Sequence, residues 1–295
     1  MPELPEVEHL RRSLDPWLVG AAFESVDIRR KGVVTLGEGS RPSPEAYARA
    51  LLVGTTIART RRHGKQMAFI GADGRALVVQ LGMTGSVTVE AGREPRGVDA
   101  RHRHVRWTVR RGGGGPEREL ARVVFRDPRR FGGLRAYGSE AALDAAWSEL
   151  GPDALTISDK AMAIALDRTT RAIKVALLDQ ALIAGVGNIY ADEALFAAQI
   201  HPETPAREVT PTQSHALAAE LRRILSHAVE AGGSTLRDYR DAFGQPGNAV
   251  QSHAAYGRAD EPCLRCESPL RGFTLGGRTT VCCERCQRRP THLST

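Results

Sequence analysis

Residues 263–286 read CLRCESPLRGFTLGGRTTVCCERC, and this stretch holds all five cysteines of the chain. Two Cys-x-x-Cys pairs, Cys263 with Cys266 and Cys283 with Cys286, are separated by sixteen residues. Each pair can supply two thiolates from one tight turn, and together they form the ligand set of a structural zinc site. Because four thiolates fill the tetrahedral shell, the sequence predicts one structural Zn ion and no catalytic metal.

A β-hairpin is predicted between the two cysteine pairs. Residues 273–275 and 279–281 have strand character, and Gly276-Gly277 between them suits a tight turn. Such a hairpin is too small to fold alone, so the metal would hold it together. Arg278 falls at the predicted tip, where its guanidinium can reach a phosphate, although a solvated surface arginine is the simpler interpretation.

The fifth cysteine leaves alternatives open. Cys282 competes with Cys283 as the partner of Cys286, but the Cys-x-x-Cys spacing favours Cys283 and leaves Cys282 as a spectator thiol. A second alternative is four structural cysteines that bind no metal. A disulfide framework is not expected, because more than 260 residues without a cysteine precede the first one.

Upstream of the cysteines, the chain has a helical part and a β-rich part. Residues 139–231 are rich in Ala and Leu and predict helices at 139–150, 159–178, 188–199 and 211–231. Residues 22–137 instead hold short β-rich runs between Gly, Pro and charged clusters, at 55–60, 66–70, 76–81, 105–109 and 121–125. This second pattern is typical of a β-sandwich or barrel.

The first residues predict a short amphipathic helix. Val7, Leu10 and Leu14 recur at helical spacing, Pro5 suits the first turn, and the Asp-Pro pair ending at Pro16 suits the end of the helix. The predicted fold class is therefore α+β, with an N-terminal helix and β-sandwich followed by a helical domain and a zinc-bound β-hairpin. The expected bounds are 1–137 for the first domain, 138–150 for a linker, 151–256 for the helical domain, and 257–295 for the hairpin and a basic tail.

Composition and charge narrow the class of protein. The chain has 295 residues, enough for two domains, and its 41 Lys and Arg against 34 Asp and Glu give a net charge of +7. This balance favours a polyanionic partner such as nucleic acid. No apolar run is long enough to span a bilayer and the start lacks the features of a signal peptide, so we expect a soluble, cytoplasmic protein.

The amino terminus can act as a nucleophile. Removal of Met1 is expected because Pro2 is small, and it would leave a secondary amine that can attack a sugar carbon and form an iminium. A terminal amine has a reference pKa of about 7.7 to 8.0, so part of it is neutral near physiological pH. Glu3 and Glu6 beside it can serve as acid and base. On residue types alone, a plain helix start explains the same residues.

Read together, these features place the chain near a known family. The sequence resembles the formamidopyrimidine-DNA glycosylase and endonuclease VIII family along nearly its whole length. Its Glu-Leu-Pro-Glu start and Arg-Arg-Phe-Gly block are more similar to the formamidopyrimidine branch. The matching blocks are MPELPEVE at 1–8, HGK at 63–65, LGMTG at 81–85, DPRRFG at 127–132, GVGNIYA at 185–191, YGR at 256–258 and the cysteine segment.

The resemblance implies a bifunctional DNA glycosylase and AP lyase of base excision repair. In this family Pro2 would form a Schiff base with C1′ of the damaged nucleotide, and Glu3 would be the general acid that opens the sugar ring. Glu6 would support that site, and Lys65 would contact phosphate and aid catalysis; taken alone, Lys65 is a surface lysine. The resemblance also implies oxidised purines as substrates, namely 8-oxoguanine and formamidopyrimidines, and strand cleavage by β,δ-elimination.

A second group of residues is implied to replace the flipped base. Met83, Arg129 and Phe131 match the trio that fills the hole left in the duplex. Flipping costs a few kcal/mol, apolar wedges restore some stacking, and a guanidinium can bond the orphaned cytosine. Without the resemblance, Met83 and Phe131 are more simply interpreted as core residues.

Backbone contacts are implied for a third group. Residues 185–188 match the turn of a helix-two-turn-helix within the 151–256 domain, where Asn188 grips phosphates beside the lesion together with Lys174. Arg278 becomes the zinc-hairpin arginine, aimed at the same backbone. The expected partner is damaged double-stranded DNA, and the chain is expected to be a monomer associated with the nucleoid through that DNA.

The sequence departs from the family in three places. It has His102-Arg103-His104 where the family often has an acidic residue between two histidines. The loop expected to cover the lesion, residues 244–255, is low in aromatics, and the basic stretch 89–101 is long. Lesion preference is therefore not determined by the sequence.

Three other functions remain open. The first is an endonuclease VIII-like glycosylase for oxidised pyrimidines. The second is a non-catalytic zinc-ribbon protein that binds damaged DNA. The third is an RNA-binding role, which the lack of an RRM-like or KH-like pattern disfavours.

Overall fold

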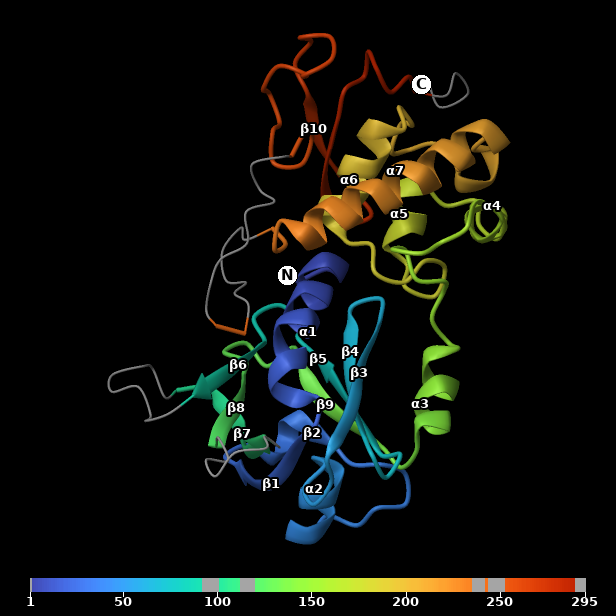
Figure 1. The fold of residues 1–295 in the computed structure, drawn as a ribbon. Helices are drawn as coiled ribbons and strands as arrows, with labels where there is room; N and C mark the ends of the chain where they lie inside the picture. Colours follow the sequence, from blue (N-terminus) through green and yellow to red (C-terminus); the bar gives the residue numbers. More distant parts are fainter. Residues whose placement is uncertain (1, 92–100, 112–119, 235–241, 244–252, 290–295) are drawn as a thin grey trace. The chain divides into compact units, whose positions relative to one another are not determined.

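A computed structural model describes residues 2–91, 101–111, 120–234, 242–243 and 253–289 (Figure 1). The chain forms two compact units, Met1–Ser148 with Gly232–Asn248, and Glu149–Ala231 with Ala249–Thr295. The first unit thus takes in Gly232–Asn248, which the sequence-based division assigns to the helical domain. Most of the basic stretch 89–101, most of the lesion-covering loop and the end of the basic tail lie outside the described residues.

The first unit is a β-sandwich with a helix at its amino end (Figure 1). One sheet has the order β1 (Ala21–Ile28), β7 (Arg103–Arg111), β8 (Leu120–Arg126) and β6 (Ser86–Ala91). The other has the order β2 (Val34–Thr35), β9 (Gly133–Tyr137), β5 (Ala76–Gln80), β4 (Gln66–Gly71) and β3 (Ile57–His63). Neighbouring strands are antiparallel except β2 and β9, which are parallel. The unit also holds η1 (Lys31–Val33), α2 (Pro44–Ala50) and α3 (Glu140–Trp147).

Apolar side chains from both sheets and from α1 (Leu4–Leu18) form one core. The α1 stripe predicted from the sequence is fully buried and packs with large side chains such as Phe23, Phe69 and Trp107. Helix α1 packs against β3 and β4, and this packing fixes the position of the first turn of α1 on the sheet. The predicted α+β class and β-sandwich are confirmed.

The predicted end of the first helix is wrong. Helix α1 continues through Pro16 to Leu18. Proline in a helix interior removes one backbone hydrogen bond and usually breaks the helix. Here Leu14 and Leu18 are completely buried, and the Val19 N–H bonds to the Asp15 carbonyl at 3.0 Å. Burial of the last turn outweighs the cost of the proline.

The second unit is helical and ends in a β-hairpin. Its elements are α4 (Asp159–Asp167), α5 (Ile173–Leu178), α6 (Asn188–Ala197), η2 (Ala206–Glu208), α7 (Pro211–Glu230), β10 (Arg271–Leu275) and β11 (Arg278–Cys282). The hairpin is confirmed, with Leu275 opposite Arg278 and positive φ angles of 57° and 74° at Gly276 and Gly277. Two consecutive positive φ values are the geometry of a type I′ turn.

The single helix predicted at 159–178 is instead two helices, α4 and α5. Between them the backbone is extended and pairs with a later segment. The Ile173 N–H bonds to the Thr204 carbonyl at 2.7 Å, and the Ala206 N–H bonds to the Arg171 carbonyl at 2.9 Å. This long-range pairing satisfies the backbone groups that a continuous helix would have satisfied internally. Within the described ranges, no helix has the length and apolar character needed to cross a bilayer.

Candidate functional site

The first turn of α1 is a buried cluster of carboxyl groups beside Pro2. Glu3 is the N-cap residue, and Glu6 reaches back so that its Oε2 accepts the Glu3 backbone N–H at 2.8 Å. The side chains of both glutamates are buried, and Pro2 is buried as well. Sequence adjacency and the helical turn therefore bring the three predicted residues together.

Glu6 also holds a segment that is remote in sequence. Its Oε1 accepts the Ser234 N–H at 2.6 Å, which ties residues 233–234 to the start of α1. Gly233 has a φ of +80°, and a Cβ added there would lie 2.8 Å from Glu6 Cγ. Only a glycine allows this close approach. Glu6 is thus a link between the amino terminus and the chain that follows α7.

Lys65 lies in the tight turn that joins β3 to β4, beside Gly64 with a φ of 55°. Its side chain is partly exposed. Since α1 packs against β3 and β4, Lys65 belongs to the sheet that carries α1. A surface lysine would have the same partial exposure, so the catalytic role of Lys65 stays a prediction.

Met83, Arg129 and Phe131 lie on two neighbouring loops. The loop before β6 starts at the end of β5, and the loop after β8 ends at the start of β9. Because β5 pairs with β9 and β6 with β8, the two loops cross between the sheets side by side. Met83 is 36% and Phe131 59% exposed, and the Arg129 guanidinium lies 5.0 Å from the Phe131 ring centre. Interpreting Met83 and Phe131 as core residues is therefore wrong.

Asn188 is the first residue of α6, after the Gly185 turn with a φ of 111°. Its side-chain Nδ2 donates to the Thr279 carbonyl of β11 at 2.9 Å. Arg278 directly precedes Thr279 and is exposed. The structure thus brings Asn188 and the hairpin arginine to the same corner of the second unit.

Lys174 does not lie where a phosphate contact requires. Its side chain is fully buried, and its Nζ lies 2.7 Å from Asp192 Oδ1. The same ammonium donates to the Thr279 carbonyl at 2.7 Å and to Thr280 Oγ1 at 2.8 Å. These three oxygens meet the three donors of an ammonium group. The predicted phosphate contact of Lys174 is corrected to an internal bridge between α5, α6 and β11.

Asp192, the partner of Lys174 in this bridge, also bonds to the backbone of β11. Its Oδ2 accepts the Val281 N–H at 3.2 Å. Burial raises the pKa of Asp192 to about 7, against the lowering effect of Lys174. Asp192 lies one helical turn after Asn188, so the two side chains share the face of α6 that contacts β11. The four-residue spacing of Asn188 and Asp192 is the sequence signal for this shared face.

We expect Lys174→Met to lower the free energy of unfolding by about 3 to 5 kcal/mol, the usual cost of removing one partner of a buried ion pair. The folded-state pKa of Asp192 lies above its ordinary value of 3.8, so protonation favours the fold. The destabilisation should therefore grow as the pH rises through about 7. Urea unfolding measures the free energy of unfolding of Lys174→Met and of the control Lys160→Met, whose lysine is exposed. Equal stability of the two variants would show that the bridge contributes nothing.

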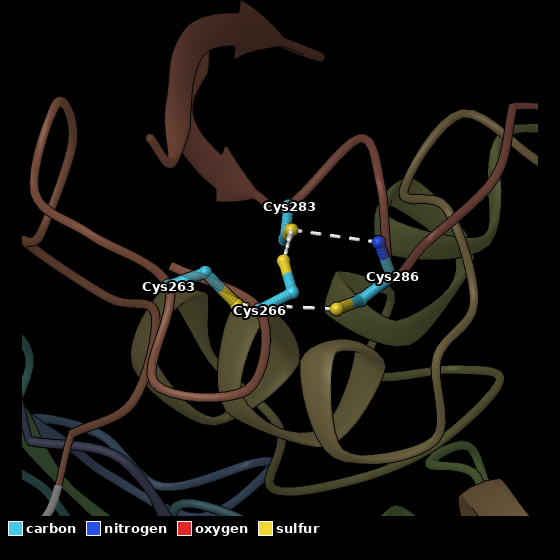
Figure 2. Close-up of side chains that lie close together, drawn as sticks. All are labelled: Cys263, Cys266, Cys283 and Cys286. Atoms are coloured by element: carbon cyan, nitrogen blue, oxygen red, sulfur yellow. Dashed lines mark hydrogen bonds between the residues drawn. The ribbon is translucent and has the colours of Figure 1, made fainter. Parts of the chain in front are cut away.

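Four cysteine sulfurs form a compact cluster at the base of the hairpin (Figure 2). The Sγ atoms of Cys263, Cys266, Cys283 and Cys286 all lie within 4.8 Å of one another, a spacing that can hold a metal ion. Dashed lines in Figure 2 join the sulfurs of Cys266 and Cys283, 3.5 Å apart, and those of Cys263 and Cys286, 3.9 Å apart. Two pairs far apart in sequence thus converge as predicted.

Cys282 lies outside this cluster. It is fully buried, and its Sγ lies 3.9 Å from His201 Nε2. Burial raises the pKa of Cys282 to about 12, so its thiol stays protonated at neutral pH. Cys282 is the last residue of β11, whereas Cys283 directly follows the strand and precedes the turn that carries Cys286. The choice of Cys283 over Cys282 agrees with the geometry.

Two models of one protein family together match most of this chain. Residues 1–134 match the family model described as the formamidopyrimidine-DNA glycosylase N-terminal domain, and residues 150–240 match the one described as its H2TH domain. The chain belongs to the formamidopyrimidine-DNA glycosylase family. This membership covers both compact units.

Relatives and solved structures of the family cover nearly the whole chain. The formamidopyrimidine-DNA glycosylase of Bacillus subtilis is 38% identical over 294 residues, covering 98% of this chain and 100% of the relative. The MutM (Fpg) protein of Thermus thermophilus is 36% identical with a TM-score of 0.78, covering 97% of this chain and 98% of that one. The Lactococcus lactis Fpg in complex with DNA containing an abasic site is 30% identical with a TM-score of 0.83, covering 98% and 100%.

Proposed function

We propose that this member of the family is a bifunctional DNA glycosylase and AP lyase that removes oxidised purines from double-stranded DNA. The observation that carries the proposal is the start of α1, where Pro2 lies beside two buried carboxyl groups. A terminal secondary amine at this place has acid and base groups within one helical turn.

The proposed reaction begins at the sugar of the damaged nucleotide. The Pro2 amine attacks C1′ as the bond from C1′ to the base breaks, so that the base leaves with the electron pair of that bond and takes up a proton, and the nitrogen loses its own proton. The Glu3 carboxyl then donates a proton to the ring oxygen, the bond from C1′ to that oxygen breaks, and the nitrogen lone pair forms the iminium of the opened sugar. Glu6 keeps the backbone of Glu3 in place through its 2.8 Å hydrogen bond. Successive β- and δ-elimination then cut the strand and leave phosphates at both ends of the gap.

The metal is proposed to be zinc. Four thiolates that converge within 4.8 Å of one another suit Zn²⁺, and a site with four protein ligands has no open position for catalysis. The ion would hold the β10–β11 hairpin and so present Arg278 to the phosphate backbone. Asn188 would contact the same backbone, whereas Lys174 would act from inside the protein as the support of the hairpin.

The substrates of solved family members support a purine preference. One solved structure is the Lactococcus lactis Fpg with DNA that contains N7-benzyl-Fapy-dG, 29% identical to this chain with a TM-score of 0.82. Formamidopyrimidines and 8-oxoguanine are both oxidised purine products. We therefore propose both formamidopyrimidines and 8-oxoguanine as substrates, in duplexes where the lesion lies opposite cytosine.

The test is a panel of duplexes that differ only in the lesion. We expect single-turnover excision of 8-oxoguanine and Fapy-guanine to be faster than excision of an oxidised pyrimidine, with borohydride-trapped adducts on each active duplex. Strand products should carry phosphates on both ends. A preference for oxidised pyrimidines would move the function to the endonuclease VIII type. No adduct on any lesion or abasic duplex would leave a DNA-binding protein without catalysis.

A further inference from the structure

Two residues with no role assigned so far connect the loops of Met83, Arg129 and Phe131. We propose that Thr84 and Asp127 are positioning residues that hold Arg129 for reading the base opposite the lesion. This inference rests on the proposed glycosylase function. It adds that opposite-base discrimination depends on one hydroxyl–carboxylate pair, the half-buried Thr84 and the buried Asp127, beneath the exposed side chains.

Asp127 anchors the second loop. Its side chain is fully buried, Oδ1 accepts the Thr84 hydroxyl at 2.6 Å, and Oδ2 accepts the Gly132 N–H at 2.7 Å. Its backbone carbonyl lies 2.8 Å from His104 Nε2, and since a carbonyl only accepts, that nitrogen carries the proton. Asp127 is thus bonded on three sides, to the first loop, to its own loop and to β7.

Thr84 connects the first loop to Arg129 directly. While its Oγ1 donates to Asp127, the same oxygen accepts the Arg129 backbone N–H at 3.1 Å. The Thr84 hydroxyl alone therefore connects the Asp127 carboxylate to the backbone N–H of Arg129. A valine has nearly the same shape but can make neither bond, whereas a serine keeps both.

The two loops are also in direct backbone contact. Gly82 has a φ of 63°, and a Cβ added there would lie 2.4 Å from the Phe131 carbonyl carbon. A Cβ added at Gly132 would lie 2.5 Å from the Gln80 carbonyl oxygen. Only glycines fit at both positions, so the loops cannot shift toward each other. The hydrogen bonds of Thr84 and Asp127 keep one loop from sliding along the other.

The exposed side chains therefore stand on a rigid base. Arg129, Met83 and Phe131 are exposed, whereas Asp127 beneath them is buried and Thr84 is half-buried, and the two are hydrogen-bonded to each other. Recognition of a base by hydrogen bonds tolerates only small displacements, on the order of 0.5 Å. Removing the Thr84 hydroxyl would leave the Arg129 N–H and one Asp127 oxygen without these partners, although all three outer side chains remain.

The experiment compares Thr84→Val and Thr84→Ala with Thr84→Ser. Single-turnover excision of 8-oxoguanine is measured opposite cytosine and opposite adenine, and borohydride trapping is measured on an abasic duplex. For Val and Ala we expect the cytosine-to-adenine ratio to fall about tenfold, the worth of one hydrogen bond to a charged group. We expect Ser to stay within about twofold of the wild type, because it restores the hydroxyl.

A second arm separates positioning from stability. In an Arg129→Ala background, Thr84→Val should leave the cytosine-to-adenine ratio unchanged, because the residue it positions is gone. An equal loss of rate opposite cytosine, opposite adenine and at the abasic site would overturn the inference, and so would a wild type without preference for cytosine. A wild type that excises no lesion would instead refute the proposed function itself.

Discussion

An alanine inserted between Met1 and Pro2 is expected to abolish base excision and covalent trapping on an 8-oxoguanine duplex. The insertion turns the Pro2 nitrogen into a tertiary amide, which is not a nucleophile. Loss of a covalent nucleophile typically costs a factor of about 10³ or more in rate. Pro2→Gly keeps an amine but replaces the secondary one and loses the fixed backbone angle, so we expect strongly reduced trapping. Single-turnover excision and borohydride trapping measure both effects.

The matched control for this prediction is Glu3→Gln. It removes the proposed general acid but leaves the amine, so excision of 8-oxoguanine should fall while trapping persists at a preformed abasic site. The sugar of that site is a hemiacetal that opens spontaneously to its aldehyde, so the amine can react there without Glu3 as the acid that opens the ring. Wild-type excision by the extended chain would show that another residue is the nucleophile. Duplex binding, measured in parallel, should be the same in all three variants.

Local patterns predicted the elements whose structure depends on local interactions. The apolar spacing of Val7, Leu10 and Leu14 defines the buried face of α1 whatever it packs against. The Gly276-Gly277 turn predicts the hairpin for a similar reason, because two consecutive positive φ angles strongly favour glycine. The cysteine spacing likewise predicted the four-sulfur cluster, since each pair presents its thiols from one turn.

Features that depend on distant partners were not predicted. The extension of α1 beyond Pro16 comes from the burial of Leu18 in the β-sandwich. The break between α4 and α5 comes from pairing with residues 204–206. The family resemblance implied a phosphate contact for Lys174, but its ammonium is buried against Asp192 and two oxygens of β11. In each case a long-range contact outweighed a sound local preference.

The candidate site shows the same division. Pro2, Glu3 and Glu6 are adjacent in sequence, so a helical turn is enough to bring them together. The contact of Glu6 with Ser234 spans more than two hundred residues and has no local signal. Thr84 and Asp127 lie inside blocks that the resemblance already used, but their mutual hydrogen bond depends on the pairing of β5 with β9 and of β6 with β8.

Cys283→Ser is expected to release the bound zinc and to weaken DNA binding, whereas Cys282→Ser should do neither. The two residues are adjacent, but only Cys283 contributes its sulfur to the four-atom cluster. A structural zinc site contributes about 10 to 16 kcal/mol of binding free energy in small zinc-finger peptides, so the hairpin should lose its order with the metal. Arg278 at its tip would then lose its place on the phosphate backbone.

Metal content and affinity for an abasic duplex, measured on the same preparations, check this prediction. Cys282→Ser is the control because it changes the adjacent residue in the same way, and Cys282 contributes no sulfur to the four-atom cluster. The Cys283 variant should bind the duplex more weakly, and its affinity should depend less on salt. The slope of log K against log salt concentration should become shallower by about 0.9 for each phosphate that the protein no longer neutralises. Equal loss of zinc from both variants would mean that Cys282 and Cys283 share the site. Full affinity after complete loss of zinc would mean that DNA binding does not depend on the ordered hairpin, and Arg278 would have to be removed from the proposed contacts.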